Sequence, residues 1–453
     1  MGRIYEKQTI ISIFALVSVV FYYFAIFYHG AGLNLLALFY LIVVILVLPS
    51  TIAQVWIFFL YFFGLVFAVV SNGMIEFLSS YLSEVGEHAE ITGAAARNAL
   101  LIAIFMCGVL LFFNAHGLLF KRTSRRLAVV DGLTIKVMVF LGFLLVIYMS
   151  YIVIRYGSPL TMGMDRFSYR KNVAPSGYGY VSSLVYVIGF AISYARETGR
   201  LRAKFSLGWL VFAMVLLVLG GEKFSGLLIL LFFYCLPYFV VSEKSLSSRH
   251  FVFGAIFILF AAMLVLLNYY SIYGSRFLEM FETRLALQGQ MLFSLDQVAS
   301  VASPSKEDII ASFFGFGNAT ESGMSYLMYL VAPQEVVDRF LEGGATFTAP
   351  YPANISYFFG FYSAPIVVFI LGGGVGALGG GLYKALRDQN FLFAILLLKM
   401  FFYVYISVVM GEVNMLVDWK MAVYLGAVLF FLMIQGVGSW ENEREYRCAA
   451  GSI

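Results

Sequence analysis

Long apolar runs recur along the whole chain, separated mostly by short polar segments. Each run approaches the roughly 20 residues that an α-helix needs to cross the hydrocarbon core of a bilayer. The pattern predicts about twelve membrane-spanning helices. They lie near residues 9–28, 33–49, 52–72, 98–118, 134–155, 179–195, 207–221, 225–242, 251–270, 356–383, 390–410 and 420–437. We therefore expect an all-α polytopic membrane protein, with one membrane domain over residues 1–453.

The composition supports this class and excludes others. Only 12% of the 453 residues are charged, 62% are hydrophobic, and the mean hydropathy is +0.90. A soluble protein carries about 25% charged residues, so this chain could not cover its surface against water. Soluble enzymes, nucleic-acid-binding proteins and secreted disulfide-rich domains are excluded. The three cysteines (Cys107, Cys235, Cys448) form neither a disulfide framework nor a metal-binding spacing.

The basic residues predict the orientation of the chain. Most of the 29 Lys and Arg residues lie on one side of the predicted spans, in short connections or at the termini. Because cytoplasmic loops are enriched in Lys and Arg, we expect both termini in the cytoplasm. Every long connection falls on the other side, near residues 73–97, 156–178 and 271–355. The last should contain helices of its own, and we expect the function at this outer face.

The connection at 156–178 is basic. Arg166, Arg170 and Lys171 lie within six residues, ahead of a Pro-Ser-Gly turn that ends at Gly177. Positive charge is disfavoured on the outer side of a membrane protein, so its presence needs a reason. Arg guanidinium groups match phosphate oxygens bidentately, which favours an anionic ligand. Attraction of a solvated loop to lipid headgroups is the alternative interpretation.

A second candidate is the tight turn Gly220-Gly221-Glu222-Lys223 between two predicted spans. Charges at such a turn near a membrane are costly unless they are paired or hydrated. Glycine lets backbone amides approach an anion, and Lys223 adds a point charge. Alternatively, Glu222 and Lys223 extend to the membrane interface without further function.

The large connection carries two further patterns. Arg276 and Arg284 lie eight residues apart, so a helix would place both on one broad face, although Arg276 and Glu279 also have the spacing of an ordinary surface pair. Residues 347–354 combine aromatic and small polar side chains. They suit sugar rings or, alternatively, an aromatic belt at the membrane interface.

Two features lie inside predicted spans. Lys399 is near the middle of its span, which makes it a candidate for function, or for pairing with a buried carboxylate. Residues 374–379 match the GxGxxG nucleotide-binding pattern, but no strand precedes them, so the required context fails. Gly372, Gly376 and Gly380 instead predict a small-residue face for close helix packing.

Histidine chemistry is not expected in the two main outer loops. His29, His88, His116 and His250 all lie outside 156–178 and 271–355, and no outer loop holds a cluster suited to a divalent metal. Phosphate chemistry would therefore depend on Arg and Lys.

These features together resemble the Wzy-type O-antigen and exopolysaccharide polymerases, in the wider group that includes the O-antigen ligases. The resemblance covers nearly the whole chain as architecture: about twelve spans, cytoplasmic ends and two functional periplasmic loops. The family motif Arg-x10-Gly is matched by Arg166 and Gly177, and Lys223 matches a basic residue in a turn between central helices. Arg276 and Arg284 match a later basic loop, although neither has Gly eleven residues on.

The resemblance implies a GT-C-type membrane glycosyltransferase of the bacterial inner membrane, active at the periplasmic face without metal or other cofactor. It would join undecaprenyl-diphosphate-linked oligosaccharide repeat units. Fixed cations would stabilise the departing diphosphate, and a carboxylate would deprotonate the acceptor hydroxyl. Expected partners are this lipid-linked substrate, membrane lipids, a chain-length regulator and a flippase, with no nucleic acid.

Candidate residues follow from the loops and the resemblance. For the leaving group we expect Arg284 and Lys223, and for the base one of Glu222, Glu279, Glu282, Asp165 and Glu321. Substrate-binding roles are expected for Arg166, Arg170, Lys171, Gly177, Arg276, Gln288, Glu321, Tyr351 and Asn354.

Two other functions stay open. An O-antigen ligase shares the architecture and the donor but transfers polymer to lipid A-core; such enzymes typically use an outer-loop histidine. A flippase or transporter for lipid-linked sugar would instead line a central path with charges, whereas the charges here gather in outer loops.

Overall fold

The computed structural model describes residues 2–114, 128–162, 164, 166–222, 224–241, 263, 266, 270, 274–316 and 321–433. Over these residues the chain is almost entirely helical, apart from one short antiparallel hairpin, β1 (Tyr81–Leu82) with β2 (Glu87–His88). The predicted class, an all-α polytopic membrane protein, is confirmed at this level.

Seven helices of the described part are long and apolar enough to cross a membrane. They are α1 (Gly2–Phe27), α4 (Phe59–Leu78), α5 (Ala94–Asn114), α7 (Ala128–Tyr156), α10 (Tyr178–Glu197), α19 (Ala364–Arg387) and α20 (Phe391–Val409). Shorter apolar helices are α2 (Ala31–Val47), α11 (Ala203–Leu219), α12 (Phe224–Val241) and Trp419–Met433. The predicted span at 251–270 lies almost wholly outside the described residues.

Two predicted spans were wrong as single helices. The span at 52–72 consists of α3 (Ile52–Ile57) and α4, which are separated at Phe58 by a non-helical backbone. The span at 356–383 is interrupted between α18 (Ala353–Phe359) and α19, where Gly360 has a φ of +79°. Glycine adopts this left-handed conformation without steric cost. A pattern of apolar residues does not predict such a break in the helix, because it contains no information on backbone conformation.

Two of the long connections contain helices of their own, all but one of them short. Residues 156–178 contain α8 (Pro159–Met162) and α9 (Arg166–Asn172). The large connection contains η2 (Gly274–Arg276), α14 (Phe277–Val301), α15 (Lys306–Asp308), η3 (Ile309–Phe313), α16 (Gly323–Val331) and α17 (Gln334–Glu342). A further short helix, η4 (Val413–Val417), follows α20. The expectation that the large loop has helices of its own is confirmed.

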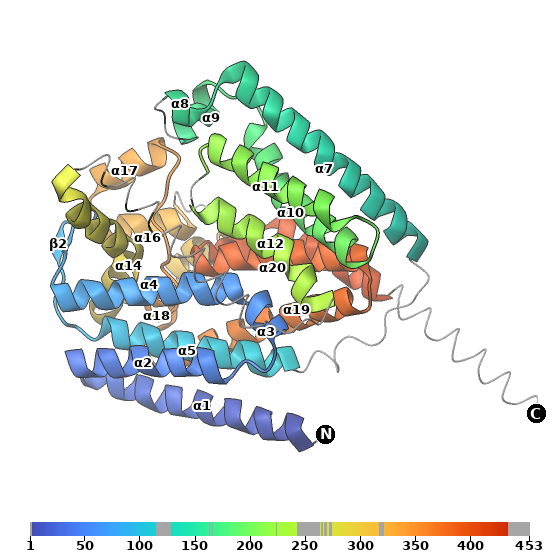
Figure 1. Ribbon diagram of the computed structural model, residues 1–453. Helices are drawn as coiled ribbons and strands as arrows, with labels where there is room; N and C mark the ends of the chain where they lie inside the picture. The colour runs from blue at the N-terminus through green and yellow to red at the C-terminus, as the bar shows by residue number, and fades with distance from the viewer. Residues whose placement is uncertain are drawn as a thin grey trace, which may run out of the picture.

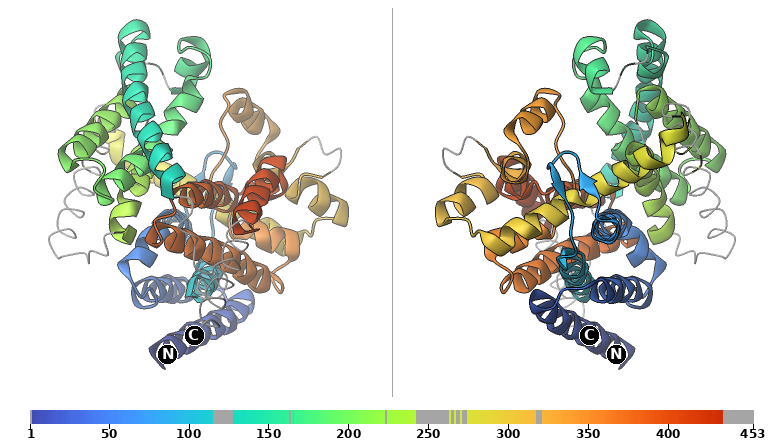
Figure 2. Two further views of the ribbon diagram at one scale, coloured as in Figure 1. Left: turned by 90° about the vertical axis from the view of Figure 1, so that its right-hand side faces the viewer. Right: turned by 90° about the vertical axis from the view of Figure 1, so that its left-hand side faces the viewer.

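These elements gather at one end of the helix bundle. In Figure 1 the hairpin, α14, α16 and α17 lie at the left with α8 and α9 above them, while the N-terminus lies at the right. We call this left-hand end the loop end. In the right-hand view of Figure 2, α14 is seen along its length while α4 and α5 are seen nearly end-on, so α14 lies across the bundle. Its middle part, from Ala286 to Asp296, is largely buried.

Helix α5 is the centre of the core, because nearly all of its residues are buried and it packs on α1, α2, α4 and α19. Its closest approach is to the glycine face of α19. A Cβ on Gly372 would lie 2.3 Å from the carbonyl oxygen of Phe105, and one on Gly376 would lie 2.1 Å from that of Val109. The absence of side chains lets the two backbones touch. The packing interpretation of the GxGxxG pattern is therefore confirmed.

Candidate functional site

The predicted basic loop and the predicted glycine turn meet at the loop end. Arg170 of α9 donates a hydrogen bond of 2.5 Å to the Glu222 carboxylate and one of 3.4 Å to the Ser182 hydroxyl. The Glu222 side chain is only 8% exposed, whereas that of Arg170 is 27% exposed. An ion pair with one largely buried partner, joining segments fifty-two positions apart, fixes the basic loop against the turn.

Further contacts hold the same two segments together. The Ser158 hydroxyl donates to the Leu219 carbonyl at 2.6 Å. A Cβ on Gly220 would lie 2.4 Å from the Tyr178 hydroxyl oxygen, so a larger residue there would displace the Tyr178 side chain. The loop is therefore fastened to the turn near both of its ends as well as at Arg170.

Of the predicted cations near this pair, the structure describes the side chains of Arg170 and Lys171. The Nε of Arg170 is buried and has no hydrogen-bond partner within the described residues. Lys171 is exposed. Arg166 begins α9, but its side chain, Asp165 and Lys223 lie outside what the structure describes.

The Gly of the Arg-x10-Gly motif has a backbone role. Gly177 has a φ of +88° and is the N-cap residue of α10. Since residues with a Cβ rarely adopt this conformation, the turn alone accounts for glycine at this position.

The second predicted group of cations lies apart from Arg170. Arg276 and Glu279 form an exposed ion pair of 2.9 Å, as the surface-pair interpretation expected. The Arg276 guanidinium lowers the pKa of the Glu279 carboxyl through its hydrogen bond and charge, which makes Glu279 a weaker base. Glu282 and Arg284 are also exposed on α14. Within the described part of the chain, no hydrogen bond or ion pair joins Arg276 or Arg284 to Arg170.

The remaining predicted binding residues are more enclosed than a surface for sugars requires. Tyr351 and Asn354 are fully buried, and the Tyr351 ring lies 5.5 Å from that of Phe105 in the core. Gln288 accepts a weak hydrogen bond of 3.4 Å from Thr348, and Glu321 is half-buried. Neither direct sugar contact by Tyr351 and Asn354 nor an interfacial aromatic belt fits this burial.

Lys399 lies in the middle of α20 and is half-buried. Within the described residues the structure records no ion pair for it. The pairing with a buried carboxylate that the sequence left open is therefore not observed there.

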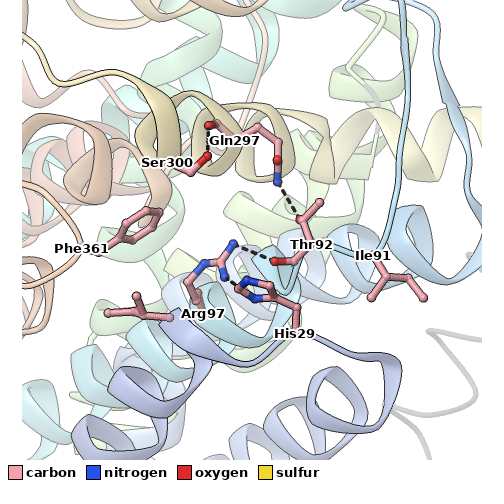
Figure 3. Close-up of a pocket in the computed structure, with 8 residues that line it drawn as sticks. His29, Ile91, Thr92, Arg97, Gln297, Ser300 and Phe361 are labelled. Atoms are coloured by element: carbon pink, nitrogen blue, oxygen red, sulfur yellow. Dashed lines mark hydrogen bonds between the residues drawn. The ribbon is translucent and has the colours of Figure 1, made fainter.

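Sequence reasoning did not single out a pocket of about 350 Å³ at the same end (Figure 3). Four segments that are far apart in the chain form it. The lining residues are Ile26 and His29, Ile91, Thr92 and Arg97, Gln297 and Ser300, and Phe361.

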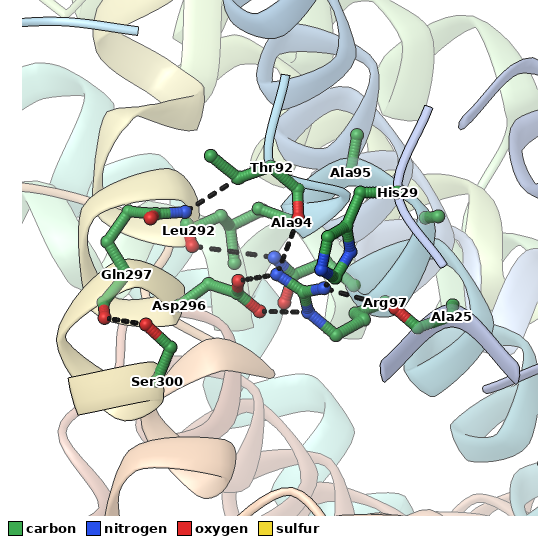
Figure 4. A network of polar contacts seen from close by, with 12 residues as sticks. Ala25, His29, Thr92, Ala94, Ala95, Arg97, Leu292, Asp296, Gln297 and Ser300 are labelled. Carbon is green, nitrogen blue, oxygen red and sulfur yellow. Dashed lines mark hydrogen bonds and ion pairs between the residues drawn. The ribbon is translucent and has the colours of Figure 1, made fainter. Parts of the chain in front are cut away.

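Arg97 of α5, which lines this pocket, forms an ion pair with Asp296 of α14 (Figure 4). Arg97 is 5% exposed and Asp296 is 1% exposed. The Nε of Arg97 donates to Asp296 Oδ1 at 3.1 Å, and its Nη2 contacts Oδ2. Its other N–H groups donate to the carbonyl oxygens of Ala25 at 3.1 Å and Thr92 at 3.0 Å, and to His29 Nδ1 at 3.4 Å. The guanidinium has five donors, and all are engaged.

The contact with Arg97 also indicates the tautomer of His29. Because an Arg N–H can only donate, His29 Nδ1 must accept, which places the proton of a neutral ring on Nε2. Gln297 donates to the Thr92 hydroxyl at 2.6 Å. The Phe361 ring lies 5.3 Å from the Arg97 guanidinium carbon.

A second buried acid secures the connection that precedes α5. Glu76 of α4 accepts hydrogen bonds from the backbone N–H of Thr92 at 2.9 Å and of Ala94 at 3.1 Å, and from the Asn34 amide at 2.5 Å. This places a carboxylate at the N-terminus of α5, where the helix dipole stabilises negative charge. The pocket wall around Thr92 is thereby held in place.

One signal could have revealed this network from the sequence. Charged residues at or within apolar spans are costly unless they are paired, and Glu76 and Arg97 both lie at such positions. Their partners could not be identified, because Asp296 is remote in sequence from Arg97 and lies on a helix that is not a membrane span.

In the described ranges, no three His, Cys, Asp or Glu side chains lie close enough together to hold a metal ion. The arrangement therefore offers two distinct environments: a partly exposed Arg–Glu contact, and a pocket with hydrogen-bonding groups but a compensated charge.

The chain is similar to one family model, that of a family of unknown function (DUF6418), over residues 317–425. This segment includes α16 to α20 and η4, which join the loop end to the core. No curated protein and no solved structure matches the chain. The fold and site thus define a helical membrane protein with a polar, structured loop end.

Proposed function

We propose that the protein is a polymerase of O-antigen or a related surface polysaccharide, which joins undecaprenyl-diphosphate-linked repeat units. The proposal includes the finer architecture: twelve spans of the GT-C type, cytoplasmic termini, and a loop end that faces the periplasm of a bacterial inner membrane.

One observation carries the proposal. Two sequence segments that were separately expected to bind a diphosphate, the basic loop and the glycine turn, are in direct contact through Arg170 and Glu222. The Arg170 side chain is 27% exposed, and the adjoining Lys171 is exposed. An anion bound here would meet cations that are already positioned, which is what stabilises a leaving group without a metal.

The reaction requires three changes at the site. An acceptor hydroxyl oxygen forms a bond to the anomeric carbon of the donor sugar, and the bond from that carbon to the diphosphate oxygen breaks. The electron pair leaves with the diphosphate, where Arg170, Arg166, Lys171 and Lys223 stabilise the charge. The hydroxyl proton passes to a carboxylate, one of Glu222, Glu279, Glu282, Asp165 and Glu321. Of these, Glu222 is the one in contact with Arg170.

The test is polymer formation by variants in cells that lack the native copy of the gene. We expect Arg170→Gln to abolish long polysaccharide chains on gels, because the diphosphate loses its positioned cation. Arg155→Gln is the matched control: Arg155 is exposed at the end of α7, close in sequence to the same loop. It should leave the chain-length distribution unchanged.

A charge exchange separates catalysis from structure. The double variant Arg170→Glu with Glu222→Arg retains an ion pair and should restore protein abundance, but it should not restore polymer. Restored polymer would mean that the pair is structural, and the assignment of the diphosphate site to Arg170 and Glu222 would fail.

An O-antigen ligase is the second candidate, favoured by one observation. His29 lies in the pocket at the loop end beside α14, although neither main loop contains a histidine. Purified protein in liposomes with lipid-linked repeat units distinguishes the functions. A ladder of products indicates the polymerase, transfer to added lipid A-core indicates the ligase, and translocation without new bonds indicates a flippase.

A further inference from the structure

The pocket lined by His29, Thr92, Gln297, Ser300 and Phe361 has polar walls without an uncompensated charge. Arg97 is paired with Asp296, and each of its N–H groups already has an acceptor. A phosphate would compete with Asp296 for the same donors, and a cation would meet Arg97. The pocket therefore suits an uncharged ligand.

The hydrogen-bonding groups that remain are mixed in kind. His29 presents Nε2–H as a donor, since its Nδ1 accepts from Arg97. Gln297 uses its amide nitrogen on Thr92, which leaves its amide oxygen as an acceptor. The Ser300 hydroxyl donates to the backbone carbonyl oxygen of Gln297 at 2.6 Å, and its own oxygen remains an acceptor. A ligand with several hydroxyl groups, each both donor and acceptor, complements this set.

The other walls are apolar. Phe361 contributes an aromatic ring, and Ile26 and Ile91 contribute aliphatic surface. Small-molecule sites typically combine such surfaces with a few convergent polar groups, in volumes of about 300–1,000 Å³. At about 350 Å³ this pocket is at the lower end of that range, so it suits one sugar ring rather than a long chain.

The polar wall is also preorganised. Arg97, Asp296 and Glu76 are buried and hydrogen-bonded, and they hold Thr92 and His29 in position without a ligand. A rigid site loses less conformational entropy when it binds.

From these observations we infer that the pocket is a binding subsite for an uncharged sugar ring of the substrate, recognised by His29, Gln297, Ser300 and Phe361. This inference rests on the proposed function, because it assigns to a glycosyltransferase the place where one sugar is held. The subsite is distinct from the Arg170–Glu222 contact, which would hold the diphosphate.

The test measures direct binding to the full-length protein in nanodiscs, by saturation-transfer difference NMR. The probes are free glucose, galactose, N-acetylglucosamine and rhamnose, with inorganic pyrophosphate as the charged comparison. We expect saturable binding of at least one sugar. Gln297→Ala and Phe361→Leu should each weaken it about tenfold, the loss expected for about 1.4 kcal/mol of binding energy.

Matched controls are Gln334→Ala and Phe316→Leu, which make the same changes at exposed positions elsewhere in the large connection. Both should bind sugar as the wild type does. Ser300→Ala is a further variant at an exposed position of the pocket. It should weaken binding even if the other two pocket variants prove unstable.

The inference fails if no sugar binds saturably, if all three pocket variants bind as tightly as the wild type, or if pyrophosphate binds and the pocket variants abolish that binding. These results differ from a failure of the proposed function. Sugar binding that depends on the pocket, together with polymer formation that survives the charge exchange at Arg170, would retain the subsite and reject the Arg170–Glu222 contact as the diphosphate site. Sugar binding that depends on the pocket, with no polymer formed by the wild type, would retain the subsite and reject the polymerase function.

Discussion

At the scale of single residues, the structure separates buried charges from exposed ones. Asp296 is 1% exposed and pairs with Arg97, whereas Glu279 pairs with Arg276 on the surface. Removing one partner of a buried ion pair leaves the other charge without compensation in a medium of low polarity. An exposed pair is screened by water and contributes little to stability.

We expect Asp296→Asn to lower the free energy of unfolding by about 3–5 kcal/mol, because the Arg97 charge remains buried without its partner. Glu279→Gln is the matched control and should cause little change. Thermal denaturation of the detergent-purified protein measures both. Equal losses in the two variants would show that burial does not distinguish the pairs.

Glu412 gives a prediction about pH. It directly precedes η4, and its carboxyl contacts the start of α16. Burial raises the pKa of this carboxyl, and the hydrogen bond from the Met324 N–H partly opposes that rise. Because the folded pKa is raised, the folded state favours the protonated form. The stability contributed by Glu412 is therefore present at low pH and is lost as pH rises from its ordinary pKa through the raised one.

Glu412→Gln mimics the protonated form and should remove this loss. The melting temperature of the wild type should fall relative to that of the variant between pH 4 and pH 7, with the variant at least as stable at neutral pH. A parallel pH dependence in the two proteins would contradict the assignment to Glu412.

At the scale of elements, the apolar pattern predicted the membrane helices well because burial in lipid requires apolar side chains along a whole span. The breaks at Phe58 and Gly360 were not predicted, because they depend on backbone conformation and not on hydropathy. The glycine face of α19 was predicted because its spacing is periodic. Its partner, α5, was known only from the structure.

The contact between α5 and α19 can be tested with two glycines of the same helix. Gly376→Ala should destabilise the protein by about 1–3 kcal/mol, since the added methyl group would overlap the Val109 carbonyl. Gly374→Ala is the control, because a Cβ there meets nothing within 4 Å. It should be neutral or slightly stabilising, as alanine favours helix. Unfolding in detergent measures the difference, and equal effects would argue against the tight crossing.

At the scale of the whole molecule, the loop end and the N-terminus lie at opposite ends of the bundle (Figure 1). The proposal places the loop end outside the cell membrane. In a cysteine-free background, Ser275→Cys in η2 should react with a membrane-impermeant maleimide in intact spheroplasts. Lys204→Cys, at the start of α11, should react only after the membrane is opened. The reverse pattern would invert the proposed orientation.

The sequence alone determined that this protein is a helical membrane protein, where most of its long apolar helices lie, and that its long connections are polar and carry clustered charge. Lipid imposes these properties locally, residue by residue along each span. The sequence also indicated Arg170 and Glu222 as candidates, because charged residues near a membrane boundary are costly unless they are paired, hydrated or functional.

Only the tertiary structure decided which charges meet. It joined Arg170 to Glu222 and Arg97 to Asp296, buried Tyr351, left Arg276 on the surface, and formed a pocket around His29 from four remote segments. The physical reason is that pairing and burial depend on how helices pack across the chain. Apolar periodicity contains no information about which helices become neighbours.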